Sequence, residues 1–201
     1  KIDTYSDEEL ARIKALLPER YQGKVIKSPA YYDPGHYKAV VSMIEFIEKS
    51  NKEEQQKILT QETIDGWNAL MSAAYSHPES LPTLLKVIQT LDKEEQKKIL
   101  TQETKEGWNA LMLAARYQPE SLPTLLKVIQ TLDKEEQKKI LTQETKPIQK
   151  GWNALMLVDE QIHPKAFMAI FKAIASSTIS LDTKYSLLNK GIKSQKYNNS
   201  I

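Results

Sequence analysis

The sequence predicts an all-α fold built as a repeat array, and three observations support this prediction. Residues 52–92 and 93–133 are two copies of one unit that differ at seven of 41 positions. A third copy begins at Lys134, and a degenerate copy precedes residue 52. Apolar residues within each copy recur with helical spacing, and no segment alternates as a strand would. Units of this kind bury a continuous core only by stacking, so we expect a helical solenoid.

Each copy contains a glycine followed by a tryptophan, and a short inner helix is expected to follow them. In the second copy, Asn109 is placed to cap that helix. Leu111, Ala114 and Ala115 then fall on one helical face. The small alanines allow a neighbouring helix to approach closely. We therefore expect this inner helix to pack against its counterparts in the adjoining copies.

An outer helix is expected after Pro119, with Ser121 as its N-cap and the following proline tolerated in the first turn. Its apolar residues form one stripe that must be buried: Leu122, Leu125, Leu126, Ile129 and Leu132. A third, charge-rich helix opens with a capping-box pair, Asp133 and Glu136. It turns only Ile140 and Leu141 inward.

The ends of the array are expected to differ from its middle. Residues 1–29 read as an N-terminal capping helix region, with an apolar face formed by Leu10, Ile13, Leu16 and Leu17. The array then spans residues 30–190, in units of 30–51 (degenerate), 52–92, 93–133 and 134–181. Residues 191–201 are polar and lysine-rich, and we expect a flexible basic tail there.

Composition excludes several classes of function. The 28 basic and 26 acidic residues give a net charge of +2, too balanced to drive nucleic-acid or membrane binding by net charge. There is no cysteine, and no stretch is apolar enough for a membrane span. We therefore expect an intracellular protein. Because the first residue is Lys1, we also expect a piece of a longer chain.

The string EGWNALMLAARYQ, followed by LPTLLKVIQTL, resembles the ankyrin repeat. Gly66, Gly107 and Gly151 match its hairpin glycine, and Ala114–Ala115 match its paired alanines. Asparagine replaces the usual capping threonine, methionine replaces the usual histidine, and an added helix lengthens each unit. The resemblance implies an ankyrin-like solenoid that binds a partner protein through a concave face formed by hairpin tips and inner helices.

Lysine-rich, cysteine-free arrays of this type also resemble those of ankyrin-repeat effectors of intracellular bacterial pathogens. This wider resemblance implies a cytoplasmic protein or one secreted, for example by type IV secretion, into the host cell cytosol. Its partner would then be a host protein.

Six of the seven differences between the two matched copies lie between the hairpin tip and the end of the inner helix. By the resemblance, this region faces a partner. The candidate partner-binding residues there are Ile64, Asp65, Trp67, Tyr75, Ser76, His77, Lys105, Glu106, Trp108, Leu113, Arg116, Tyr117 and Gln118. Neutral drift at exposed positions is the alternative interpretation. Against it, exposed outer-helix positions such as Lys86 and Gln89 are unchanged between the copies.

Two further features belong to the same candidate surface. Trp67, Trp108 and Trp152 recur at one position of each copy, either packed against the next hairpin or exposed as an aromatic ledge. The third copy has three extra residues in its hairpin. We expect that insertion to lengthen the tip into a contact element carrying Lys146, Ile148 and Lys150.

Catalytic chemistry finds little support in the sequence. The three histidines do not form a metal-binding or triad pattern, and no phosphate-binding loop or nucleophile motif occurs. We expect no enzyme activity, no metal and no cofactor. Two other functions stay open: a scaffold that positions a domain outside this chain, and binding to a membrane surface or nucleic acid through Lys184, Lys190, Lys193 and Lys196.

Overall fold

The computed structural model describes residues 47, 49–76, 80–147, 151–158 and 163–198, apart from the side chains of Ser76 and residues 193–198. These residues form helices joined by turns and loops, without any strand, so the predicted all-α class is confirmed for them. The expected N-terminal capping helix and most of the degenerate unit lie outside the described residues.

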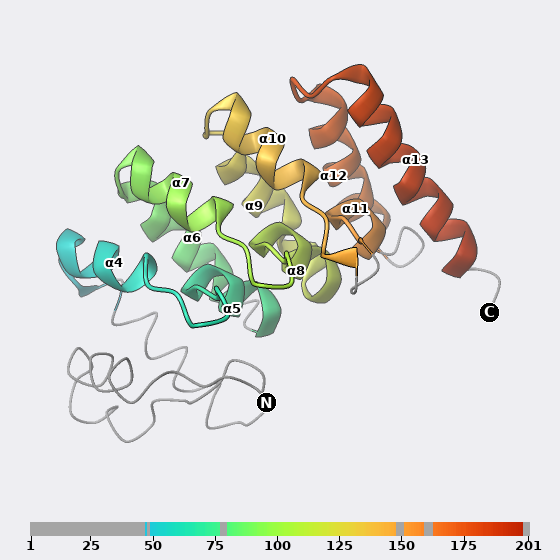
Figure 1. The fold of residues 1–201 in the computed structure, drawn as a ribbon. Helices are drawn as coiled ribbons and strands as arrows, with labels where there is room; N and C mark the ends of the chain where they lie inside the picture. The colour runs from blue at the N-terminus through green and yellow to red at the C-terminus, as the bar shows by residue number, and fades with distance from the viewer. Residues whose placement is uncertain (1–46, 48, 77–79, 148–150, 159–162, 199–201) are drawn as a thin grey trace.

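The helices fall into three sets according to their place in each copy (Figure 1). The charge-rich helices are α4 (Lys52–Leu59), α7 (Lys93–Thr101) and α10 (Lys134–Thr142). The inner helices are α5 (Ala69–Ser76), α8 (Ala110–Tyr117) and α11 (Ala154–Leu157). The outer helices are α6 (Leu81–Thr90), α9 (Leu122–Ile129) and α12 (Pro164–Ser176). Corresponding helices lie side by side: α8 contacts α5 and α11, α9 contacts α6 and α12, and α7 contacts α10.

Asparagine caps each inner helix, as predicted for Asn109. Its side-chain oxygen accepts a hydrogen bond from the backbone N–H of Met112 at 2.9 Å. The equivalent bonds at Asn68 and Asn153 are 2.9 and 3.0 Å long. The predicted inner face of α8 is also confirmed, since every residue from Ala110 to Ala115 is buried. The small side chains of Ala110, Ala114 and Ala115 allow α8 to pack between α5 and α11.

The whole predicted apolar stripe is buried, and its last member, Leu132, lies beyond the end of α9 at Ile129. Pro119–Ser121 form a 3₁₀ turn, η1, directly before this helix. Ser121 occupies the N-cap position, but its side chain makes no capping hydrogen bond. The stripe therefore carries the apolar contacts of the outer helix, while the turn sets where the helix begins.

The charge-rich helix α10 buries Ile140 and Leu141, as predicted. The predicted capping box is wrong, because the Asp133 side chain makes no capping hydrogen bond. The Glu136 carboxylate instead lies 2.6 Å from the Lys97 ammonium on α7. A residue expected to close its own helix end thus links two neighbouring copies.

The chain before α5 and the chain before α8 each form a tight hairpin. In the first copy, the backbone N–H of Thr63 donates to the carbonyl of Trp67 at 2.8 Å, and that of Gly66 donates back to Thr63 at 2.9 Å. Gly66 has a φ of +81°, which favours glycine. Adjacent tips are joined by backbone bonds of 2.9 Å, from the N–H of Lys105 to the carbonyl of Asp65 and from Lys146 to Glu106.

The C-terminal helix α13 (Leu181–Asn198) packs against α11 and α12. Its close approach to α11 depends on Gly191, where a Cβ would lie 2.4 Å from Leu155. The predicted flexible tail from residue 191 is therefore wrong at its start, because the helix continues through Asn198 and covers the last inner helix. None of the helices that the structure describes is long and apolar enough to cross a membrane.

Candidate protein-binding face

Six side chains from three copies form a connected cluster on one side of the inner helices. We call this cluster the tryptophan face, and it comprises Trp67, Tyr75, Trp108, Arg116, Tyr117 and Trp152. The Trp67 and Tyr75 rings meet edge to face, with centroids 5.7 Å apart. Tyr75 then contacts Tyr117 of the next copy at 4.5 Å. Such edge-to-face pairs add to the stability gained from burial alone.

Arg116 continues the cluster into the third copy. Its guanidinium carbon lies 5.5 Å from the ring centroids of Tyr117 and Trp152 and 5.9 Å from that of Trp108. A cation at this distance over an aromatic ring is attracted by the electron-rich face of the ring. One exposed arginine is thereby held by aromatic rings from two copies.

Each tryptophan is positioned by the hairpin that precedes it. A buried threonine hydroxyl accepts the tryptophan backbone N–H at 3.0 Å for Thr63 and Trp67, and at 2.9 Å for Thr145 and Trp152. Tyr75 and Arg116 occupy equivalent positions at the end of the inner helix, and each contacts the tryptophan of its own copy. The same local fold thus presents different chemistry in successive copies.

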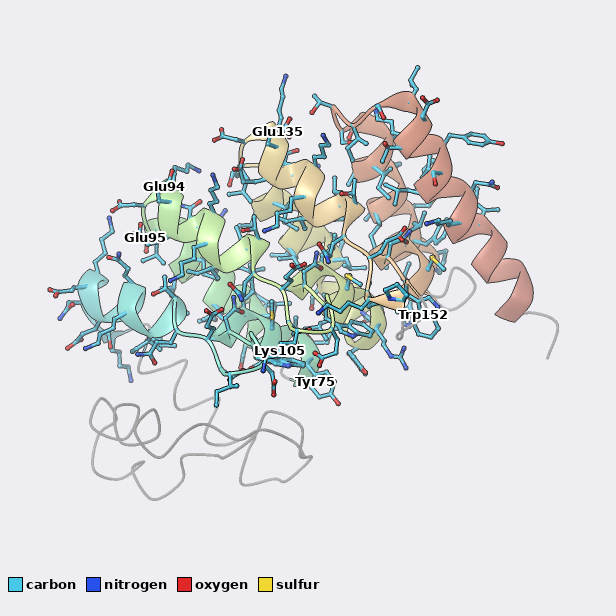
Figure 2. The ribbon with its side chains drawn as sticks, viewed as in Figure 1. Tyr75, Glu94, Glu95, Lys105, Glu135 and Trp152 are labelled. Carbon is cyan, nitrogen blue, oxygen red and sulfur yellow. The ribbon has the colours of Figure 1, made fainter. Side chains whose placement is uncertain are left out.

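Exposure separates the tryptophans from their neighbours. The three indoles are half-buried, and Trp67 and Trp108 pack against the hydrophobic core. Tyr117 is 44% exposed, and Arg116 is also exposed. Each tryptophan therefore has one part that is buried by packing and another part that is exposed at the surface. Figure 2 shows Tyr75, Lys105 and Trp152 on the hairpin side of the array, away from Glu94, Glu95 and Glu135.

The hairpin tips add charge and one apolar side chain beside the tryptophan face. Ile64 is 51% exposed at the first tip. The Lys105 ammonium lies 3.3 Å from the Asp65 carboxylate, so these two predicted site residues pair across copies. Glu106 is half-buried, and Lys146 is exposed at the third tip.

Two predicted binding residues do not belong to this surface. Leu113 is 3% exposed and Gln118 is 4% exposed, so neither is available to a partner. Leu113 packs in the core between copies. The Gln118 side-chain amide donates to the carbonyl of Ala73 at 2.7 Å and joins the second copy to the first. Their variation between copies is explained by packing rather than by recognition.

Several other predicted residues cannot be placed. His77, Ile148 and Lys150 lie outside the described residues, as does the side chain of Ser76.

Of the lysines expected to form a basic tail, Lys184 donates to the carbonyl of Ala175 at 2.8 Å. Lys190 pairs with Glu144 at 2.7 Å. Both are therefore occupied by contacts within the chain. The side chains of Lys193 and Lys196 are not described.

Sequence reasoning missed a second apolar surface at the C-terminal end. Leu181 and Tyr185 on α13 are 82% and 73% exposed, and Ile192 is also exposed. Helical spacing brings these residues to one side of α13, and that spacing was the available signal. Of these three residues, Ile192 alone lies in the segment for which a tail is expected.

In the described part of the chain, the two groups with clearly shifted pKa values are Lys97 and Glu136, which lie on the opposite, charge-rich side. The hydrogen bond from Lys97 lowers the pKa of Glu136, and the same bond raises the pKa of Lys97. Gln56 of the preceding copy donates to Glu95 at 2.6 Å in the equivalent place. The difference between Gln56 and Lys97 therefore replaces a neutral donor to the glutamate of the next copy with a positively charged one.

Within the described ranges, no three His, Asp or Glu side chains gather closely enough to hold a metal ion. His163 stands at the N-cap position of α12, with its imidazole nitrogen 3.2 Å from the Glu120 carboxylate. In the described part of the chain, the tryptophan face is therefore the strongest candidate for a functional site. Comparison with protein-family models and with curated proteins finds no match to this chain.

Proposed function

We propose that this chain is an ankyrin-like repeat array whose function is to bind another protein through the tryptophan face and the adjoining hairpin tips. The lateral packing of corresponding helices supports the repeat architecture. The hairpin that precedes each inner helix, with its positive-φ glycine, supports the likeness to the ankyrin unit. The added charge-rich helices lie as a separate row in this arrangement.

The observation that carries the proposal is the connected group of exposed Arg116 and Tyr117 and half-buried Tyr75, which contacts the half-buried tryptophans. Tyrosine, tryptophan and arginine are the residue types that most often supply binding energy at protein interfaces. Because rings from adjacent copies already hold one another, binding would immobilise few additional side chains. A rigid aromatic surface is therefore favourable for binding a macromolecule.

The location of the sequence differences supports the same surface. Tyr75, Arg116 and Tyr117 are products of substitution between the two matched copies. The outer helices α6 and α9 are identical in sequence over their described length, including the exposed Lys86 and Lys127. Side chains of the tryptophan face and of the hairpin tips thus differ between the copies, while the outer helices are identical. The resemblance to bacterial effector arrays leads us to propose a host protein as the partner.

Affinity capture from a eukaryotic cell lysate tests this function when two matched variants are used. The first combines Arg116→Ala with Tyr117→Ala on the tryptophan face. The second combines Lys86→Ala with Lys127→Ala on the exposed outer helices. We expect a protein that is retained by the unaltered chain and by the outer-helix variant but lost from the first variant. Equal capture by both variants would contradict a binding role for the tryptophan face.

A further inference from the structure

The guanidinium of Arg116 differs from three lysine ammonium groups in the described part of the chain. Lys105, Lys97 and Lys190 each lie within ion-pair distance of a carboxylate, at 3.3, 2.6 and 2.7 Å. Arg116 has no such carboxylate among the residues that the structure describes, although it is exposed. Its contacts are instead with the rings of Trp108, Tyr117 and Trp152.

Aromatic contacts restrain a guanidinium without consuming its hydrogen-bonding capacity. The π faces attract the positive charge, while the N–H groups still point outward in the guanidinium plane. Those N–H groups match a carboxylate with two parallel hydrogen bonds. Three rings around Arg116 therefore leave it ordered, charged and able to bind a carboxylate from outside the chain.

The surroundings of Arg116 favour an anion at this place. Lys146 is exposed at the third hairpin tip, next to Thr145, whose backbone N–H is bonded to Trp152. At the first tip, the negative charge of Asp65 is already paired with Lys105. Tyr117 presents a 44% exposed ring directly against the guanidinium. A carboxylate on Arg116 would thus have an apolar surface beside it.

We propose that Arg116 is the anchor for a carboxylate of an acidic peptide segment in the partner, with an aromatic or aliphatic neighbour of that carboxylate resting on Tyr117. This inference rests on the proposed function and specifies the chemistry of the partner. Tyr75 occupies the position of Arg116 in the preceding copy and brings a ring without a permanent charge. The permanent charge of the tryptophan face therefore lies with the second and third copies and is absent from the first, which fixes the direction in which a peptide lies on this face.

Selection from a display library of random peptides on the full 201-residue chain tests the proposal. We expect the selected peptides to share an acidic residue beside an aromatic or aliphatic one. Changing that acid to its amide should weaken binding to the unaltered chain by about tenfold or more. The same peptide change should have little effect on Arg116→Gln, because the partner of the carboxylate is already removed.

Two further variants sharpen the result. Arg116→Lys keeps the charge but loses the planar fork, so it should restore only part of the affinity lost in Arg116→Gln. Lys127→Gln on α9 removes an exposed charge from the outer face and should leave binding unchanged. Peptides with free and amidated C-termini distinguish a side-chain carboxylate from a terminal one. Thermal melting of each variant confirms that its fold is retained.

The outcomes separate this inference from the proposed function. Peptides that need Tyr117 but show no acid dependence, or an equal acid effect in Arg116→Gln, would overturn the carboxylate anchor and leave the binding face standing. A selection whose peptides all tolerate Tyr117→Ala, or that returns no binder, would overturn both. Loss of affinity confined to the matched acid and arginine changes would support both.

Discussion

The side-chain amide of Asn109 donates a hydrogen bond of 3.1 Å to the backbone carbonyl of Ile140 in the next copy. Helix α10 ends at Thr142, so this carbonyl has no donor within its own helix. Asn68 bonds the carbonyl of Ile99 at 2.9 Å in the same way. One asparagine thus caps its own inner helix and satisfies an unpaired carbonyl of the following copy.

Asn153 lacks the second of these bonds, since its buried side-chain nitrogen has no partner in the described part of the chain. Leu187 on α13 is buried like Ile140 and corresponds to it in sequence. Because α13 continues to Asn198, the carbonyl of Leu187 lies in a helix interior, where it accepts an intrahelical bond. The last copy is thus closed by helix packing rather than by an asparagine link.

This difference predicts unequal effects for two identical substitutions. Asn109→Ala should lower the free energy of unfolding by about 2–3 kcal/mol, because it removes a cap and a buried hydrogen bond between copies. Asn153→Ala removes only the cap and should cost about 1 kcal/mol. Urea denaturation of both variants measures the difference. Equal losses would show that the link from Asn109 to Ile140 contributes nothing to stability.

The hairpin glycines provide a second comparison. Gly66 and Gly151 both have positive φ, +81° and +62°, so alanine should cost about 1 kcal/mol in backbone strain at either place. At Gly66 the new Cβ would also lie 2.6 Å from the carbonyl oxygen of Glu103, whereas at Gly151 the nearest atom is 3.8 Å away. Gly66→Ala should therefore be the more destabilising change in a urea titration. The reverse order would contradict the close stacking of adjacent tips.

The buried apolar positions within individual helices could be predicted from the sequence alone. Period and identity between copies predicted the buried stripe of α9, the small inner face of α8 and the cap by Asn109, because each follows from spacing within one helix. Contacts between copies were harder to predict. Gln118 looked like a variable surface residue, and its bond to Ala73 depends on how two copies stack.

The candidate site was only partly predictable for a similar reason. Comparison of the copies identified Tyr75, Arg116 and Tyr117 as a group, but the contacts of Tyr75 with Tyr117 and of Arg116 with Trp152 join residues that are distant in sequence. The polar composition of the C-terminal segment suggested a tail. The close fit of Gly191 against Leu155, which lets the helix pack there, is a tertiary relationship without a local signal.

Substitutions on the two faces of one copy should differ strongly in their effect on stability. Leu126 is 4% exposed in the outer-helix stripe, so Leu126→Ala should cost about 2–5 kcal/mol through lost burial and a residual cavity. Tyr117 is 44% exposed, and Tyr117→Ala should cost about 1 kcal/mol or less. Chemical denaturation gives both values. Comparable losses would mean that Tyr117 serves the core rather than a surface.

The ion pair between Lys97 and Glu136 predicts a pH dependence. Lys97 lowers the pKa of Glu136 below 4.5, so the stabilisation is present above that value and is lost as the pH falls through the folded-state pKa. The raised pKa of Lys97 means that stabilisation is also lost as the pH rises above 10.5 and passes through the folded-state value.

Lys97→Gln is the matched control for this pair, because the preceding copy already uses Gln56 to bond Glu95. The stability advantage of the unaltered chain over this variant should be constant near neutral pH and should shrink at both extremes. Added salt should reduce it as well, since the Lys97 side chain is 46% exposed. Urea midpoints measured across pH check this, and a difference that never varies with pH would exclude a role for charge.

The longer hairpin of the third copy should affect binding more than stability. Replacing residues 146–150 with Lys-Glu recreates the tip of the second copy. That shorter tip makes the same 2.9 Å backbone bond to its predecessor, so the array should retain its stacking and lose no more than about 1 kcal/mol. The replacement keeps a lysine at position 146 but removes Pro147 and Ile148 and exchanges Lys150 for glutamate, so it should weaken the binding of peptides selected through Arg116. Thermal melting and peptide titration test the two halves separately, and undiminished peptide affinity would exclude the tip from the binding site.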